Sequence, residues 1–203
     1  MAMTANRPAA HGKRAFVLLM GLLCFAARAE DAGWRLTVIP SFQAKPPIHE
    51  EIPGSKTAVL TVARAAGYGE FEYATTRGAL RYAKDIASAK GAQWIVESEV
   101  EIRRDKDGVV DRVLITGDNP LLPSLAVAPA LYDRFEPVLG DGFHVIIPDR
   151  NTIALYPRIA GQIPANEAAA LLEIKRTATY PVSSEVFRAT RLGLVADGEL
   201  RDD

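Results

Sequence analysis

The chain has 203 residues, of which 48% are hydrophobic, and a formal net charge of −1 at pH 7. This length is sufficient to bury a core without disulfides or metals. The charge argues against nucleic acid as a partner, because phosphate binding needs a basic face. The single cysteine, Cys24, lies within the first 29 residues. The rest of the chain therefore has no disulfide, no thiol nucleophile and no cysteine metal site.

Segment 1–29 has the pattern of a secretory signal peptide. It begins with a positive region, continues with an apolar run over 15–26, and ends with an A-x-A cleavage site at Ala27-Arg28-Ala29. The apolar run is shorter than the roughly 20 residues that span a bilayer. We therefore expect a periplasmic or secreted chain with no transmembrane segment after signal cleavage. Without the four basic residues of this segment, 20 basic and 25 acidic residues remain, a net charge near −5.

The first half of the mature chain predicts strands followed by a helix. Residues 34–39 alternate as in a strand, and residues 57–62 are rich in β-branched side chains. Between them, segment 40–56 contains four prolines and predicts an irregular exposed stretch. The apolar spacing over 77–90 predicts a helix.

The second half predicts two hairpins and further helices. The hairpins cover 94–103 with 109–116, and 143–147 with 152–156. Segment 120–139 has helical spacing, and Pro129 must kink that helix or start a new one. The remaining expected elements are a helix over 166–178, a short helix over 184–189, a strand over 192–195 and a frayed tail over 197–203.

Hairpins interleaved with helices predict an α+β fold. We expect a single domain over 30–203, partly irregular over 30–56. Its antiparallel or mixed sheet would be built from hairpins, with helices packed mainly on one face. A doubly wound parallel sheet would instead need single strands between the helices.

Three short motifs carry possible chemistry, each with a simpler alternative. Glu97, Glu99 and Glu101 would share one face of a strand, either as acid–base carboxylates or as a solvated face. Segment 105–108 resembles part of a calcium loop but has a hairpin-turn composition, and Arg103 occupies the position of the first ligand. Segment 54–57, Gly-Ser-Lys-Thr, resembles the end of a phosphate loop but lacks its glycines, so we expect no nucleotide site.

The histidines do not predict a metal centre. A zinc site would need both His49 and His144 together with a carboxylate, and no local spacing supports that set. His144 alternates with Phe143 and Val145, which places it on one face of a strand. It would be a surface or hydrogen-bonded residue, or a catalytic base. We expect no metal and no cofactor.

The turn Pro148-Asp149-Arg150-Asn151 is the main candidate contact point. Proline, aspartate and asparagine all favour turns, and an arginine on a rigid tip suits a bidentate contact with a carboxylate or phosphate. The same arginine could instead lock the turn through an internal ion pair. The possible internal partners are Asp133, Glu136 and Asp141.

The same region resembles a known family. The residues that carry the likeness are Ala130-Leu131-Tyr132, Gly140, Val145-Ile146-Ile147-Pro148-Asp149-Arg150 and Tyr180-Pro181-Val182-Ser183. Over roughly residues 76–195 they resemble the YtpQ-like family of uncharacterised bacterial proteins. That family has an acid after the arginine of its Pro-x-Arg-Asp turn, whereas this chain has Asn151 there and Asp149 before the arginine. The resemblance implies an α+β domain and no activity.

Two functions follow as hypotheses. The first is an exported binding or interaction domain, whose partner is an envelope protein or a small ligand and whose binding residues are His144, Asp149, Arg150 and Asn151. The alternative is an envelope hydrolase that uses carboxylate and histidine chemistry near the 144–150 hairpin.

Overall fold

The computed structural model describes residues 33–42, 45–67, 70–158 and 163–201. The expected signal peptide and its cleavage site lie outside these residues. Residues Arg35–Asp203 form one compact unit. Within the described part of the chain, no helix is both long and apolar enough to cross a membrane.

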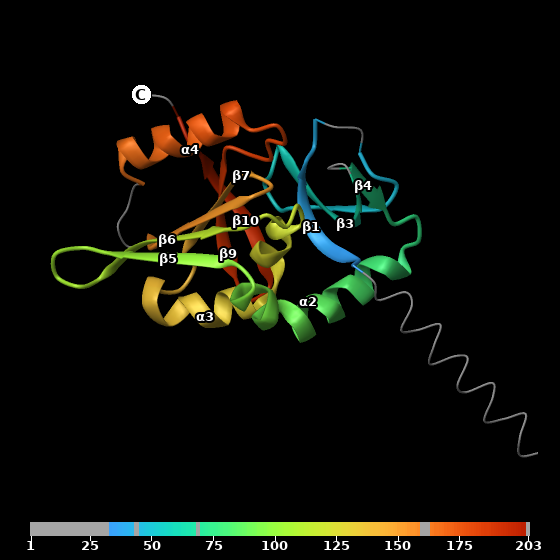
Figure 1. Ribbon diagram of the computed structural model, residues 1–203, viewed down its shortest axis with the longest axis horizontal. Helices are drawn as coiled ribbons and strands as arrows, with labels where there is room; N and C mark the ends of the chain where they lie inside the picture. The colour runs from blue at the N-terminus through green and yellow to red at the C-terminus, as the bar shows by residue number, and fades with distance from the viewer. Residues whose placement is uncertain (1–32, 43–44, 68–69, 159–162, 202–203) are drawn as a thin grey trace, which may run out of the picture. The chain divides into compact units, whose positions relative to one another are not determined.

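Six antiparallel strands form the larger sheet, in the order β10-β9-β7-β8-β6-β5 (Figure 1). Three of its neighbouring pairs are hairpins, namely β5–β6, β7–β8 and β9–β10. Every pairing in the sheet is antiparallel. The strands are β5 (Glu99–Arg104), β6 (Val110–Thr116), β7 (His144–Asp149), β8 (Thr152–Tyr156), β9 (Glu185–Thr190) and β10 (Gly193–Glu199).

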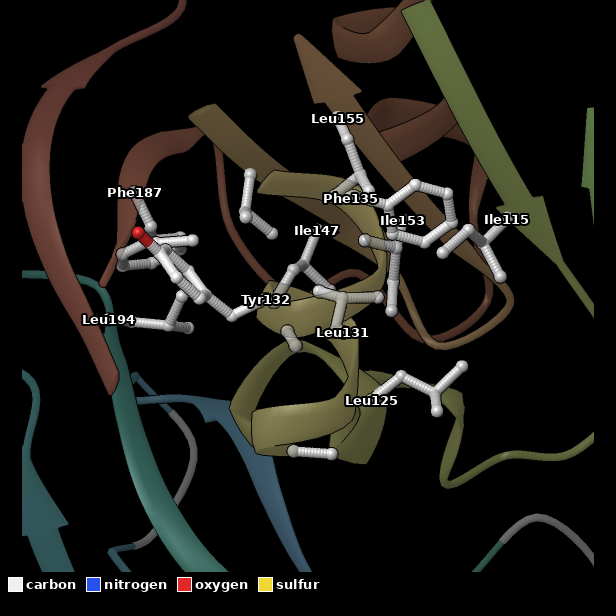
Figure 2. Packing of buried hydrophobic residues seen from close by; sticks show 14 of the residues in the cluster. Ile115, Leu125, Leu131, Tyr132, Phe135, Ile147, Ile153, Leu155, Phe187 and Leu194 are labelled. Atoms are coloured by element: carbon white, nitrogen blue, oxygen red, sulfur yellow. The ribbon is translucent and has the colours of Figure 1, made fainter. Parts of the chain in front are cut away.

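Both faces of this sheet are covered by hydrophobic clusters. Side chains alternate along each strand, so successive residues belong to opposite clusters. Val145 and Ile147 of β7 join the main core, and Ile146 between them joins a smaller cluster on the opposite face. Figure 2 shows how the main core packs around α3. The helical elements on this side are α2 (Gly78–Val96), the 3-10 helix η1 (Leu122–Val127) and α3 (Pro129–Leu139). The smaller cluster is covered by α4 (Ala165–Thr177), which lies across the sheet from α3 (Figure 1).

A smaller antiparallel sheet is built around β3 (Ala58–Gly67). β1 (Arg35–Pro40) pairs along one edge of β3, and β2 (His49–Glu51) and β4 (Glu70–Tyr73) pair with it in succession. Side chains of this sheet are buried in the main core, so the two sheets share one hydrophobic interior. The shared residues include Val38 and Ala58, together with Ile52 of the adjoining loop.

The α+β class, the antiparallel pairing and the predominance of helices on one face are confirmed. The sequence prediction of a new helix at Pro129 is also confirmed, because α3 begins there. The structure adds a second sheet, and α4 covers the face that the prediction left open.

Three local predictions are wrong. The expected strand start at residue 94 lies in α2, which continues to Val96 because Trp94 and Ile95 face the core. Segment 184–189 forms strand β9 rather than a helix, because pairing with both β7 and β10 satisfies its backbone. The expected frayed tail is shorter, because β10 continues to Glu199 and Leu200 is buried.

Glu185 of β9 connects the larger sheet to the segment that leads into β3. Its buried carboxylate accepts hydrogen bonds from the Ser55 hydroxyl (2.6 Å) and from the backbone amides of Lys56 (2.6 Å) and Thr57 (3.4 Å). The hydroxyls of Thr57 and Ser183 lie 2.8 Å apart beside it. Burial by itself would raise the pKa of Glu185. The hydrogen bonds outweigh burial and hold the pKa below its ordinary value of 4.5.

We expect Glu185→Gln to lower the free energy of unfolding at pH 7 by about 2–3 kcal/mol, because three donors lose a charged acceptor. The melting temperature should fall by roughly 5–10 °C. Since the folded-state pKa is depressed, the stabilisation exists above about pH 4.5 and is lost as the pH falls through the lower folded-state value. The gap between wild type and variant should therefore narrow between pH 7 and pH 3. Glu99→Gln, at an exposed position of β5, is the control. A constant gap would contradict the assignment of an ionised carboxylate.

Candidate functional site

Hydrogen bonds of Asp149 and Asn151 hold the tip of the β7–β8 hairpin. The Asp149 carboxylate accepts a hydrogen bond from the Asn151 amide (3.1 Å), which closes the turn. The Asn151 side chain donates to the Gly117 carbonyl (2.7 Å), and the Gly117 amide donates back to the Asn151 carbonyl (3.2 Å). Asp149 also bridges to Pro181. Asp149 and Asn151 therefore reverse the chain and tie the tip to its neighbours.

Arg150 does not project from this tip into solvent. Only 9% of the residue is exposed, and its guanidinium lies between the rings of Phe71 (3.9 Å to the centroid) and Tyr180 (4.1 Å). Burial lowers the pKa of Arg150, and the nearby Tyr73 and Tyr180 oppose that shift. Aromatic faces at these distances stabilise a guanidinium through cation–π interaction. Arg150 thus joins the hairpin tip to β4 and to the segment before β9.

The expected internal acids serve elsewhere. Asp141 accepts a hydrogen bond from the Tyr132 hydroxyl (2.5 Å), and Glu136 lies 3.5 Å from the guanidinium of Arg191. The prediction of a structural role for Arg150 therefore fits the structure through aromatic stacking, a contact that the sequence interpretation did not include.

His144 lies at the opposite end of β7 from this turn. It is the first residue of the strand and Asp149 is the last, a separation of about 16 Å in an extended strand. The close grouping of His144, Asp149 and Arg150 that a hydrolase at this hairpin would need is not formed. Any site at His144 must draw on other elements.

His144 belongs to a row of polar side chains that crosses the α4 face of the larger sheet. It lies opposite Arg188 of β9 and opposite Tyr156 of β8, and residues in register share a face. The row continues through Glu167 of α4 to Arg112 of β6 and Arg103 of β5. We call the five sheet residues the polar row: Arg188, His144, Tyr156, Arg112 and Arg103.

Glu167 organises one half of the polar row. It is 8% exposed and accepts hydrogen bonds from Arg103 (2.5 Å), Arg112 (2.8 Å) and the Tyr156 hydroxyl (3.1 Å). Burial would raise the pKa of Glu167, but these three donors together hold it below its ordinary value. Burial, followed by the charge of Glu167, raises the pKa of Tyr156, so its hydroxyl stays protonated. These contacts fasten the first turn of α4 to the sheet, although the buried Nε of Arg112 has no hydrogen-bond partner among the described residues.

The other half of the row surrounds His144. The imidazole Nε2 lies 3.3 Å from a carboxylate oxygen of Asp197, which also lies 4.0 Å from Nε of Arg158. Arg188 packs beside them, next to Gly142, whose φ of 68° and close contact with the arginine stem leave no room for a side chain. These residues supply two guanidinium groups and one carboxylate, which gives the group a net positive charge.

Arg188 has an unsatisfied hydrogen-bond donor. Its Nε is buried and, within the described residues, has no hydrogen-bond partner. A buried donor without an acceptor costs about 1–3 kcal/mol, and buried polar groups in folded proteins are nearly always paired. This guanidinium is available to a ligand that brings its own acceptor. We call His144, Arg158, Arg188 and Asp197 the His144 cluster.

The other sequence candidates lie apart from the His144 cluster. Glu97 ends α2, while Glu101 on β5 pairs with Arg112 at 2.6 Å, so the three alternating glutamates do not form one strand face. Segment 54–57 binds the internal carboxylate of Glu185. No group of three or more potential metal ligands occurs among the residues that the structure describes.

Sequence reasoning found His144 but missed its partners. Arg188 was assigned to a short helix and Asp197 to the frayed tail, so neither could be placed beside β7. Comparison with protein-family models, curated proteins and solved structures found no match for the chain. The resemblance to the YtpQ-like family therefore stays a prediction.

Loss of the Arg150 stack should destabilise the fold. We expect Arg150→Ala to lower the free energy of unfolding by about 2 kcal/mol, because the rings of Phe71 and Tyr180 lose the guanidinium that packs against them. Arg150→Lys should recover only part of the loss, because an ammonium cannot stack as a plane. Urea denaturation measures both, with Arg104→Ala on the exposed β5–β6 hairpin as the control. Wild-type stability in Arg150→Ala would contradict a structural role.

Loss of the Glu167 charge should loosen α4 locally. We expect Glu167→Gln to cost about 2 kcal/mol, less than a fully buried pair, because Arg103 and Arg112 keep Asp111 and Glu101 as partners. Amide hydrogen exchange should accelerate in α4 while β7 and β8 stay protected. Glu173→Gln, on the exposed side of the same helix, should leave the exchange pattern unchanged.

Proposed function

We propose that this protein is an exported binding domain that holds the anionic group of a small ligand at the His144 cluster. The chemical class is an oxyanion, either a carboxylate or a phosphate. The observation that carries the proposal is the buried Arg188 Nε, which has no hydrogen-bond partner within the described chain. A guanidinium supplies a planar set of donors that matches an oxyanion.

The charges and rigidity of the cluster support the same assignment. Arg158 and Arg188 outnumber Asp197, so an anion would neutralise an excess positive charge. Arg188 and His144 lie on paired strands inside the six-stranded sheet, which fixes the spacing of their backbones. Donors held on rigid strands lose little conformational entropy when a ligand binds.

A second candidate function rests on the His144–Asp197 pair. A carboxylate 3.3 Å from one imidazole nitrogen can orient the ring, and the other nitrogen could then act as a general base toward water. Hydrolysis of a bound phosphate ester or carboxylate ester is the corresponding reaction. Ester turnover by the wild type that disappears in a folded His144→Ala variant would favour this alternative over simple binding.

Calorimetric titration with inorganic phosphate, pyrophosphate and succinate tests the binding proposal. We expect Arg188→Met to weaken binding at least tenfold, because a charge-assisted hydrogen bond contributes about 1.5–3 kcal/mol. The same variant should melt at or above the wild-type temperature, since methionine removes a buried unsatisfied donor. Arg188→Lys should bind with intermediate affinity.

The matched control is Arg176→Met on the exposed surface of α4, which should bind like the wild type. Equal affinity in Arg188→Met and wild type would overturn the assignment. So would the absence of measurable binding of all three anions to the wild-type protein.

A further inference from the structure

A groove lies on the opposite side of β9 from the polar row. Its volume is about 730 Å³, within the range of small-molecule sites. Its walls come from the small sheet, from the junction of η1 and α3, and from the β9–β10 turn. Its apolar lining includes Leu36, Leu60, Val127, Pro129, Leu131 and Leu194. Leu131 and Leu194 also belong to the core that Figure 2 shows, so the floor of the groove is the edge of the main core.

A second hollow of about 590 Å³ adjoins this groove and has a different character. Arg77, Arg81 and Lys84 line it from α2, spaced so that they share one face of the helix, and His49 lines it from β2. Glu50 is the acid of its lining. Three cationic side chains and one carboxylate line the hollow, and within the described part of the chain the Arg77 and Arg81 side chains form no ion pair, so the hollow is positively charged.

Glu50 and Lys84 line both cavities and form an ion pair of 2.8 Å at their junction. One continuous surface therefore changes from an apolar groove to a cationic hollow across a single ion pair. The exposed Leu192 at the β9–β10 turn extends the apolar wall at the groove's rim. Charge at one end and apolar surface at the other match a ligand with the complementary polarity.

We propose that these two cavities form one site for a monomeric single-chain anionic amphiphile, a fatty acid. The carboxylate lies in the hollow beside Arg77 and Arg81, and the acyl chain lies in the groove against Leu36, Val127 and Leu192. Arginine suits the carboxylate because its donors match both oxygens. The acyl chain is held by the area it removes from water, which grows with every methylene.

This site is independent of the oxyanion site at the His144 cluster. Arg188 lies on the α4 face of β9, whereas the neighbouring Ala189 lines the groove on the core face. The alternation of β9 separates the two sites by the thickness of the sheet. Because Arg188→Met removes the proposed oxyanion site, dodecanoate binding that persists in this variant belongs to the groove, and the loss of one site can be distinguished from the loss of the other.

Calorimetric titration with dodecanoate, below the concentration at which it forms micelles, tests the proposal. We expect binding by the wild type, at least tenfold weaker binding by Arg81→Glu, and severalfold weaker binding by Leu192→Asp. Both positions are exposed, so these variants should fold. Decanoate should bind about fifteenfold more weakly than dodecanoate, because each of the two methylenes removed costs about fourfold.

Matched controls are Arg104→Glu and Val109→Asp on the β5–β6 hairpin, which make the same kinds of change at exposed positions outside both cavities. Equal binding of dodecanoate by Arg81→Glu and wild type would overturn the head-group assignment. Dodecyltrimethylammonium should bind much more weakly than dodecanoate, and equal affinity would overturn it as well. No binding of dodecanoate, or binding only to anionic phospholipid vesicles, would overturn the proposal in favour of another occupant.

Discussion

The buried carboxylate of Glu185 is the contact on which both proposed sites depend. It fixes segment 55–57 to the start of β9 through two amides and a hydroxyl. That segment leads directly into β3, so these hydrogen bonds join the small sheet to β9 of the larger sheet. The groove needs both walls in place, because one comes from the small sheet and the other from the β9–β10 turn. Arg188 lies three residues beyond Glu185 on the same strand, so its position depends on the same anchor.

The alternation of β9 explains why one strand can serve two unrelated surfaces. Phe187 and Ala189 face the main core, whereas Val186 faces the cluster under α4. Arg188 shares the face of Val186 and meets His144 there. A strand with both faces covered has no solvated side for a charged residue. A charged side chain on such a strand therefore needs a partner within the protein or from a ligand. Arg103 and Arg112 pair with Glu167, but the buried Nε atoms of both Arg112 and Arg188 lack an acceptor among the described residues.

Local patterns predicted two of the three hairpins in the larger sheet, and a kink or a helix start at Pro129, because turn residues and the missing amide of proline act over a few residues. Segment 184–189 defeated the same reasoning. Its six residues are too few to show a period, and its strand conformation comes from β7 and β10, which lie far away in the sequence. His144 was placed correctly on one face of a strand for the opposite reason, since its neighbours alternate clearly.

Segment 54–57 was not expected to bind a nucleotide, yet its backbone amides do bind an anion. Its likeness to a phosphate loop comes from small and hydroxyl residues that expose backbone amides to an anion. The structure uses that property on an internal anion, the Glu185 carboxylate. The sequence alone could not show this, because the acid lies some 130 positions further along the chain.

Arg150 lies in the turn between β7 and β8, whereas Arg188 lies on β9, and comparing the two arginines explains why the proposed site is at Arg188. The sequence favoured Arg150, because a charged residue at a turn is expected to project into solvent. Its partners, Phe71 and Tyr180, come from segments that no local pattern links to the turn. The guanidinium packs against both rings, so Arg150 connects the hairpin turn to β4 and to the segment before β9 and does not project into solvent. Arg188 has the opposite arrangement: it is held by a strand inside the sheet and its buried Nε lacks an acceptor among the described residues. The proposed oxyanion site therefore rests on an unsatisfied hydrogen-bonding group of an interior strand rather than on a charge at a turn.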